Sequence, residues 1–392
     1  MERYRIITGS ACLALALTVR IAVSAPAETR AQVLAKVEQV ADWQLDHLGA
    51  GDSSAPAPRA APRGWVYAMF FVGLTALADR AGDSLYADAI FALGRRERWQ
   101  LESRPFHADD YLIGQSWIWA YERSGDPIAI AAVRNRLDAI VAHPPTSSLD
   151  YGSNPPPDME SACQVRWCWA DALFMGPPTF AALTHATGDP RYLVYADAEF
   201  WATVRYLEDP KEGLLVRDSR FFSRRGPHGE KIFWSRGNGW ALAGTVNVLR
   251  ALPRNDPSRQ TYLRIFSDIS ERIAGLQQSD GLWKAGLLDQ SSYNSSEISG
   301  SAFFTYALAW GINERLLDRS KYGPVVERSW RAMLQHIYAD GRLGSIQPIG
   351  AAPDAFSPSS SYVYGVGAFL LAGSELDRYA AQGIPSYRVK LR

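Results

Sequence analysis

Three carboxylates stand at the start of apolar stretches of helical length. Asp109 and Asp110 come directly before the stretch 111–121, and Asp171 lies at the start of the stretch 170–183. Carboxyl groups that gather in one site can act as acid, base or nucleophile, above all on glycosidic bonds. A simpler role stays open for each of them, because Asp at a helix start commonly caps that helix.

Aromatic and polar residues occupy the same kind of position, in the loops that enter the apolar stretches. An aromatic face beside hydrogen-bonding groups is how proteins hold a pyranose ring. Helix N-termini and a planar guanidinium favour an anionic ligand, so we expect a uronic acid rather than a neutral sugar. The candidate ligand-binding residues are His107, Asp110, Trp169, Trp234, Arg236, Asn238, Trp240 and Glu297.

Several of these residues also have a structural interpretation. His107 is more typical of a hydrogen-bonded structural histidine than of a metal ligand, although the sequence H-x-D-D has suitable atoms. Arg236 could pair with an acid such as Asp218, Trp240 could belong to the core, and Glu297 could be an exposed loop acid. The position that all of them share, before an apolar stretch, is what favours a site.

The environment of Asp171 pulls its pKa in two directions. A helix N-terminus lowers the pKa of an Asp, which handicaps a general acid. A second carboxylate and an apolar wall of Trp, Phe174 and Met175 would raise the pKa again. We therefore expect the surroundings to decide whether Asp171 can carry a proton at neutral pH.

The elements that must position these residues are helix hairpins. Residues 80–84, 123–127 and 186–190 share a Gly-Asp turn, in which Gly ends one helix in the left-handed conformation and Asp caps the next. The stretch before each turn is apolar almost all round, whereas the stretch after it, such as 192–207, is amphipathic. Each hairpin therefore has a buried inner helix and an outer helix.

The same alternation continues to the end of the chain without the Gly-Asp turn. It predicts six hairpins and hence an all-α (α/α)6 toroid with inner and outer helix rings, although an open helical solenoid has the same period. Parallel inner helices would gather their entry loops at one mouth. The remaining inner stretches are 239–252, 300–313 and 363–374, and the remaining outer stretches are 261–276, 325–337 and 28–48.

Composition narrows the choice of partner. The 392 residues carry 41 Lys and Arg against 41 Asp and Glu, so zero net charge argues against a nucleic-acid partner. The chain also has 13 Trp, more than a core needs. We expect four of them to cluster at the mouth, namely Trp167, Trp169, Trp234 and Trp240.

The first 27 residues are typical of a cleaved export signal. Arg3 and Arg5 precede an apolar run over 6–19, and small residues in an A-x-A-like pattern follow. A retained membrane anchor is the alternative. Cleavage would leave residues 28–392 as one barrel domain without a membrane span, in the periplasm or outside the cell.

Cys163 and Cys168 are the two cysteines of this mature region, and export would permit a disulfide between them. Two buried, unpaired cysteines are an equally good interpretation of their spacing. Two cysteines cannot form a zinc site by themselves, and we expect neither a metal nor another cofactor.

The chain resembles the unsaturated rhamnogalacturonyl and glucuronyl hydrolases of glycoside hydrolase family 105 and the related family 88. The matching stretches run in order across nearly the whole mature chain, which makes the resemblance specific. They are HADDYLIGQ (107–115), WADALFMGPP (169–178), FWSRGNGWALAG (233–244), GLWKAGLLDQ (281–290), SGSAFFTYALAWGIN (299–313) and YGVGAFLLAGSE (364–375).

The resemblance implies an (α/α)6 barrel without a metal that acts on oligosaccharides ending in a 4,5-unsaturated uronic acid. In such enzymes an aspartic acid protonates C4 of the vinyl ether, water adds at C5, and the hemiketal opens to release the next sugar. By motif, Asp171 falls on the acid/base position and Asp109, five residues before Gly114, on the second acid. Trp234, Arg236 and Trp240 fall on substrate-contacting positions.

One departure concerns the loop before the RGNGW motif. Relatives often place a His there, whereas this chain has Arg217 and Arg220, which we expect to contact the carboxylate or the sugar. The departure leaves open which uronyl oligosaccharide is preferred. A conventional inverting glycosidase and a non-catalytic oligosaccharide-binding protein are the alternative functions.

Overall fold

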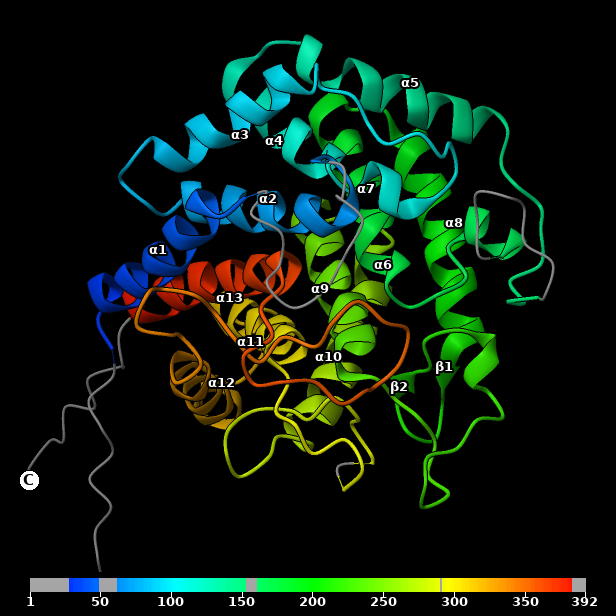
Figure 1. Cartoon of the computed structure of the whole chain (residues 1–392). Helices are drawn as coiled ribbons and strands as arrows, with labels where there is room; N and C mark the ends of the chain where they lie inside the picture. Colours follow the sequence, from blue (N-terminus) through cyan, green and yellow to red (C-terminus); the bar gives the residue numbers. More distant parts are fainter. Residues whose placement is uncertain (1–27, 49–61, 153–160, 290, 383–392) are drawn as a thin grey trace, which may run out of the picture.

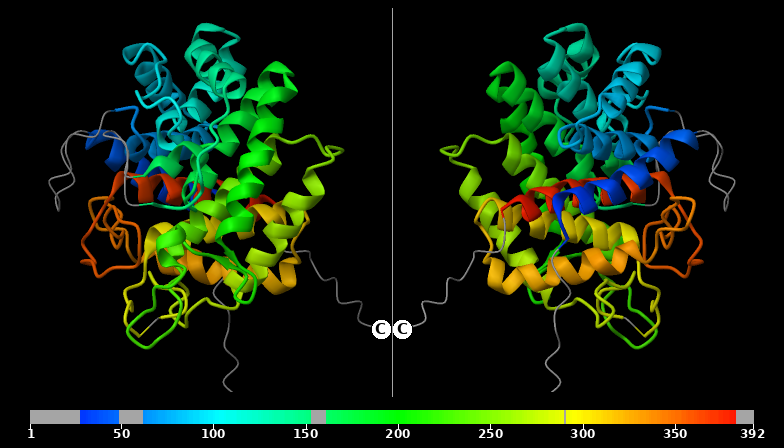
Figure 2. Two further views of the ribbon diagram at one scale, coloured as in Figure 1. Left: turned by 90° about the vertical axis from the view of Figure 1, so that its right-hand side faces the viewer. Right: turned by 90° about the vertical axis from the view of Figure 1, so that its left-hand side faces the viewer.

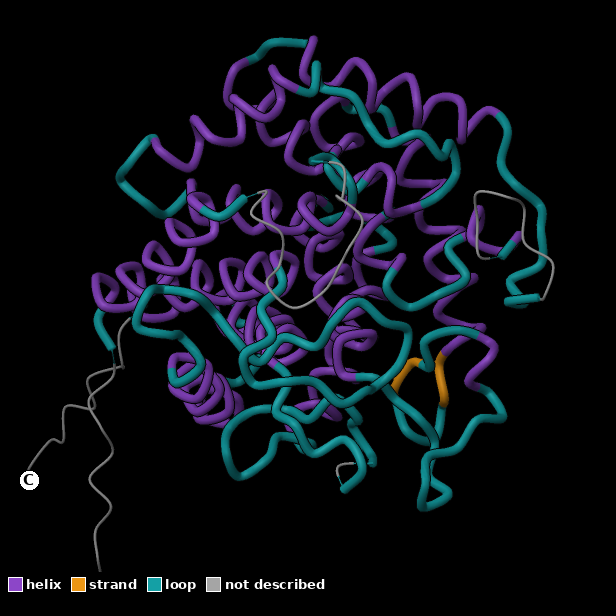
Figure 3. Tube along the Cα trace, viewed as in Figure 1, coloured by secondary structure: helices purple, strands orange, loops and turns teal. Residues whose placement is uncertain are grey.

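The computed structural model describes residues 28–48, 62–152, 161–289 and 291–382, and helices dominate them (Figure 3). Strands β1 (Glu208–Asp209) and β2 (Leu214–Leu215) form one short antiparallel pair. The α-helices are α1 (Arg30–Asp46), α2 (Trp65–Ala78), α3 (Leu85–Arg96), α4 (Gly114–Ser124), α5 (Ile128–Ala142), α6 (Ala172–Met175), α7 (Pro177–Thr187), α8 (Pro190–Leu207), α9 (Ser235–Ala251), α10 (Arg259–Ala274), α11 (Ile298–Asn313), α12 (Arg319–Leu334) and α13 (Val363–Ala381).

The helices divide into an inner and an outer set, as the apolar patterns predict. The inner α11 is apolar all round, and each of its 16 residues is buried. The outer α10 buries only one face, which includes Tyr262, Phe266 and Ile273, and exposes the other. The inner set comprises α2, α4, the pair α6 and α7, α9, α11 and α13, while α3, α5, α8, α10, α12 and α1 lie outside.

The inner helices close into a ring, which confirms the toroid and excludes the open solenoid. Each inner helix packs on the next along the chain, and the last, α13, packs against the first, α2. Gly73 on α2 and Gly367 on α13 permit this close packing. A Cβ atom on Gly73 would lie only 2.3 Å from the carbonyl oxygen of Gly367, which is too close for any side chain. Outside the ring, α1 packs along α13, so segments from the two ends of the chain lie side by side (Figures 1 and 2).

The third inner stretch, predicted as one helix over 170–183, is broken into α6 and α7. The break falls at Gly176, and Pro177 and Pro178 follow it. Neither proline has a backbone N–H to continue the hydrogen-bond ladder of α6, so a new helix starts there. The second stretch also begins later than predicted, because the 3-10 turn η1 (Ala108–Tyr111) precedes α4.

The three Gly-Asp turns follow the prediction except at one glycine. Asp83, Asp126 and Asp189 each accept a hydrogen bond from the backbone N–H two residues ahead. Gly125 and Gly188 are left-handed, with φ of 69° and 75°. Gly82 is not, because α2 already ends at Ala78 and several residues share the reversal.

The described helices contain no segment that is both long and apolar enough to cross a bilayer. The export signal predicted for residues 1–27 lies outside the described residues, so it stays a prediction.

Candidate active site

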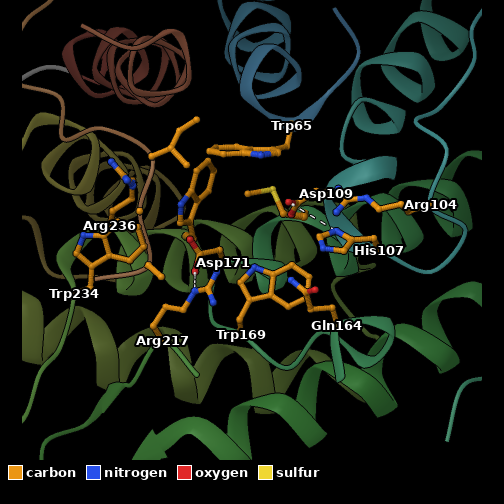
Figure 4. Close-up of a pocket in the computed structure, with 15 residues that line it drawn as sticks. Trp65, Arg104, His107, Asp109, Gln164, Trp169, Asp171, Arg217, Trp234 and Arg236 are labelled. Carbon is orange, nitrogen blue, oxygen red and sulfur yellow. Dashed lines mark ion pairs between the residues drawn. The ribbon is translucent and has the colours of Figure 1, made fainter. Parts of the chain in front are cut away.

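The N-terminal ends of α2, α4, α6 and α9 and the loops beside them surround a cavity of about 340 Å³, which is large enough for a small ligand. Its walls combine cations, carboxylates and indole rings, several of which surround Asp171 in Figure 4. The lining residues are Trp65, Arg104, His107, Asp109, Gln164, Trp169, Asp171, Met175, Arg217, Trp234, Arg236, Trp240, Ile349, Gly350 and Ala351.

Asp171 is a buried acid at the centre of this cavity. It directly precedes α6, but its side chain makes no capping hydrogen bond to that helix, so the capping interpretation is wrong. Its Oδ2 lies 3.5 Å from Nε of Arg217 and accepts no hydrogen bond from any residue that the structure describes. The carboxyl group is therefore held in the cavity beside one guanidinium group and not by a capping hydrogen bond to α6.

The surroundings raise the pKa of Asp171 above its ordinary value. Burial is the largest cause, Arg217 and Arg236 oppose it, and the nearby Asp109 adds to the increase. The apolar wall and the second carboxylate therefore outweigh the two guanidinium groups. An acid of this kind keeps its proton to a higher pH than a solvated Asp does.

Arg217 is fixed beside Asp171 from two directions. Its Nη1 donates to Oδ2 of Asp218 at 2.7 Å, and Arg220 binds the same Asp218 carboxylate. The backbone N–H of Ala170 donates to the carbonyl of Arg217 at 2.8 Å, which joins the Arg217 loop to the residue before Asp171. The cation and the acid therefore hold a defined relative position.

Asp109 and His107 form the opposite wall. Oδ2 of Asp109 lies 3.8 Å from Nδ1 of His107, and the imidazole packs against Trp169 with ring centres 5.0 Å apart. Asp109 lies close enough to Asp171 to raise its pKa. Among the described residues, no group of three His, Cys, Asp or Glu could hold a metal ion.

Arg236 lies at the third side of the cavity and does not pair with Asp218. Its Nη1 and Nη2 donate to the backbone carbonyls of Gln347 and Pro348, at 2.6 and 2.7 Å. The guanidinium also lies 4.4 Å from the ring centre of Trp234. Arg236 thus presents a fixed positive charge while holding the loop that follows α12.

Trp240 belongs both to the core and to the cavity. It is 1% exposed and packs against Phe174 and Phe303, with ring centres 4.9 and 4.3 Å apart. The same side chain also lines the cavity. Trp169 and Trp234 line it too, whereas Trp167 is buried in the core and donates from Nε1 to the hydroxyl of Tyr111. The prediction that Trp167 lies at the mouth is therefore wrong.

Three predicted contact residues, Asp110, Asn238 and Glu297, lie outside the cavity lining. The Asp110 carboxylate accepts hydrogen bonds from the guanidinium and the backbone N–H of Arg104. The Asn238 side chain exchanges two hydrogen bonds of 2.9 Å with the backbone of Leu215, two residues before Arg217.

Glu297 is fully buried, not an exposed loop acid. It caps α11 through the N–H groups of Ser299 and Gly300 and also accepts from the N–H of Gln347. Asp110, Asn238 and Glu297 therefore have the same kind of role. Each fixes a neighbouring segment that supplies a side chain to the cavity.

A disulfide joins Cys163 and Cys168, which settles the choice that the sequence left open. Both cysteines are buried. Gln164, inside the disulfide loop, and Trp169, directly after it, both line the cavity. The disulfide therefore restrains one wall of the candidate active site.

Sequence reasoning missed Trp65, Arg104, Gln164 and residues 349–351. Trp65 is the first residue of α2. Because the entries of the inner helices are expected to face the mouth, its position in the sequence could have predicted that it lines the cavity. The other residues lie in irregular loops or a short 3-10 turn, whose course no periodic pattern predicts.

Comparisons with known proteins identify the family of this chain. The sequence model of Glycosyl Hydrolase Family 88 matches residues 36–380; sequence resemblance had indicated this family and the related family 105. An unsaturated 3S-rhamnoglycuronyl hydrolase from Alteromonas sp. (strain LOR) is 38% identical over 347 residues, 86% of this chain and 84% of that protein.

A second protein of the same name, from Formosa agariphila, is 35% identical over 353 residues, 88% of this chain and 90% of that one. Among solved structures, a glycosyl hydrolase of family 88 from Bacteroides vulgatus superposes with a TM-score of 0.78 and 28% identity. That match covers 90% of this chain and 100% of the other.

Proposed function

The chain belongs to Glycosyl Hydrolase Family 88 and is a hydrolase of unsaturated uronyl oligosaccharides, in which we propose that Asp171 is the catalytic acid. The observation that carries this assignment is the position of Asp171. It is a buried acid of raised pKa, without a capping role, at the centre of a cavity lined by cations and aromatic rings.

The chemistry that suits this site is hydration of the C4=C5 vinyl ether. Protonated Asp171 gives its proton to C4, and water supplies a hydroxyl group to C5 while its remaining proton returns to the carboxylate. The product is a hemiketal at C5, whose ring C5–O bond breaks to give a ketone at C5 and a hemiacetal at C1. The hemiacetal then collapses to an aldehyde and releases the next sugar with its hydroxyl group restored. The raised pKa of Asp171 favours the protonated form that the first step requires.

Arg217 and Arg236 give the cavity two fixed positive charges for the uronate carboxylate. Both guanidinium groups are anchored, Arg217 by Asp218 and Arg236 by two backbone carbonyls, so little side-chain entropy is lost when a ligand binds. The indole rings of Trp169, Trp234 and Trp240 supply apolar faces for the sugar ring. Asp109, across the cavity, is the second catalytic acid and orients the attacking water.

The curated relatives are named for a rhamnoglycuronyl substrate, and we extend that preference to this chain. The substrate would then be an unsaturated uronyl group attached to rhamnose at the non-reducing end of a lyase product.

Export of the enzyme is a further part of the proposal. A signal over residues 1–27 would deliver it to the periplasm or the medium. The Cys163–Cys168 disulfide supports this location, because structural disulfides are typical of oxidising compartments.

Asp171→Asn tests the catalytic assignment. Loss of the ultraviolet absorbance of the double bond reports hydration of a lyase-generated disaccharide. We expect the rate to fall about 1,000-fold, within the range for removal of a general acid. Asp197→Asn is the matched control, since Asp197 also has a raised pKa through burial but lies on α8 outside the cavity. Equal rates for Asp171→Asn and the wild type would refute the assignment.

The two alternative functions give different results with the wild type. A conventional inverting glycosidase would cleave the saturated analogue of the same disaccharide. A binding protein would retain the unsaturated disaccharide without any loss of absorbance. We expect turnover of the unsaturated substrate alone.

A further inference from the structure

The loop between α12 and α13 contributes one edge of the cavity through residues 346–352, which we call the mouth strap. Figure 1 shows the long connection between these helices passing in front of the inner ring. Three successive strap residues, Ile349, Gly350 and Ala351, line the cavity. The strap therefore faces whatever part of the substrate lies at the opening.

Gln347 fixes the mouth strap to three inner helices. Its side chain accepts a hydrogen bond from Nε1 of Trp234 and donates to the carbonyl of Ala352, at 2.9 and 2.7 Å. Its backbone N–H donates to Glu297, and its carbonyl accepts from Arg236 and from the hydroxyl of Tyr364. Gln347 is 1% exposed, so the strap has a rigid, buried anchor.

Ile349 lies two residues beyond this anchor and is 51% exposed. Single exposed apolar side chains are ordinary on protein surfaces. Ile349 differs from Ile128, which is 58% exposed on the outer helix α5, because Ile349 also lines the cavity. An anchored backbone thus presents a bare apolar side chain to the substrate.

The depth of the other lining groups places the two sugars. Asp171 and the side chains of Arg217 and Arg236 are almost fully buried, so the unsaturated uronyl ring must lie deep in the cavity. The sugar that is released must then lie toward the opening. Ile349 and the half-buried Trp65 give that opening an apolar character.

We propose that Ile349 on the mouth strap contacts the methyl group of a 6-deoxyhexose in the leaving-sugar position, and so helps to select that sugar. The proposal rests on the proposed function, because it assumes that the uronyl group occupies the deep part of the cavity. A hexose that carries a hydroxymethyl group would place a hydroxyl against the Ile349 side chain, which offers it no hydrogen bond.

The expected selectivity is modest. An apolar site rejects an added hydroxyl group weakly, by about 100-fold when it is fully enclosed. Because Ile349 is half exposed, we expect a preference of about fivefold to tenfold in kcat/KM, expressed mainly in KM.

The test compares two disaccharides that differ by one oxygen atom, with the unsaturated uronyl group joined to L-rhamnose or to L-mannose. The wild type should prefer the rhamnose substrate. Ile349→Ala should reduce that preference to less than twofold, and Ile349→Asn should reverse it. Ile128→Ala, the matched substitution of an exposed isoleucine outside the cavity, should keep the wild-type ratio.

The role of Ile349 would be overturned if both Ile349 variants kept the wild-type ratio of kcat/KM for the two disaccharides while thermal denaturation showed that they are folded. It would also be overturned if the wild-type enzyme did not discriminate between the two substrates. Failure of the proposed function would give a different result, because the wild type would then hydrate neither disaccharide.

Discussion

Each end of the barrel contains a buried acid, but the two acids differ in the number of hydrogen bonds that they accept. At the mouth, Asp171 has a cation 3.5 Å away, and its Oδ2 accepts no hydrogen bond from the described parts of the chain. At the opposite end, Glu375 on α13 accepts hydrogen bonds from Arg250, Arg378 and Asn313, at 2.7, 2.9 and 2.8 Å. Both acids are less than 10% exposed.

This difference separates a structural acid, Glu375, from Asp171, which we propose as the catalytic acid. Glu375 is surrounded by donors, and these hydrogen bonds join the ends of α9, α11 and α13. Asp171 is buried without an equivalent set of donors, and this burial raises its pKa above the ordinary value of an Asp. Burial alone would not distinguish the two, whereas the number of donors does.

The largest expected effects come from exchanging each acid for its amide. Asp171→Asn should abolish most of the activity, as described above, and leave a folded protein. Glu375→Gln should do the reverse, costing about 2 kcal/mol of unfolding free energy because charge-assisted hydrogen bonds are lost, with kcat unchanged. Urea denaturation and initial rates measure the two quantities. A fall in kcat without destabilisation in Glu375→Gln would contradict the division.

The next effect concerns the cation beside Asp171. Arg217 lowers the pKa of Asp171, so Arg217→Gln should raise that pKa further. Because activity requires the protonated acid, the alkaline limb of the pH–rate profile should move to higher pH. KM should rise about tenfold through loss of a charged contact to the uronate. Arg217→Lys keeps the charge and should leave the limb nearer its wild-type position. A limb that stays in place in Arg217→Gln would show that Asp171 does not govern it.

A smaller effect should follow from opening the Cys163–Cys168 disulfide. The double variant Cys163→Ser/Cys168→Ser frees the wall that carries Gln164 and Trp169. We expect a loss of about tenfold in kcat/KM, since a misplacement of about 1 Å can cost up to about 100-fold. Stability should fall by about 2 kcal/mol, as for a short disulfide loop. Reductant should slow the wild type and leave the double variant unaffected. Equal kcat/KM for the double variant and the wild type would show that the wall holds without the bond.

The smallest expected effect is a gain in the stability of the whole protein when the buried acid at the mouth is removed. The folded state raises the pKa of Asp171, so it loses stability relative to the unfolded state as the pH rises through that pKa. Asp171→Asn removes this cost. Its unfolding free energy should exceed that of the wild type at pH 8, by less than about 2 kcal/mol, with a smaller difference at pH 4. A less stable variant at pH 8 would mean that Arg217 stabilises the carboxylate more than burial destabilises it.

The sequence is informative about the ring because helical periodicity is a local signal. The apolar and amphipathic stretches predict which helices are inner, and the entry rule places Asp109, Asp171 and Arg236 at one mouth. The same rule does not show which way a side chain turns from its entry. Asp110 follows Asp109 directly, yet it turns away to bind Arg104.

Long-range loop contacts are the part that the sequence does not reveal. The mouth strap has no periodic pattern, and its position depends on Gln347, which is buried by contacts from α9, α11 and α13. The disulfide likewise depends on the distance between two residues, and a spacing of five positions leaves that distance undetermined.

Ring closure has a consequence for synthesis of the chain. The contact between α2 and α13 joins the first inner helix to the last, and α1 packs on α13. The ribosome synthesises α1 and α2 long before α13. The earlier hairpins therefore keep apolar faces exposed until α13 has been synthesised. The cavity, which includes Trp65 from α2 and residues 349–351 from the loop before α13, is therefore completed only after α13 has been synthesised. A nascent chain that stalls before α13 would contain Asp171, the proposed catalytic acid, without the enclosed cavity around it.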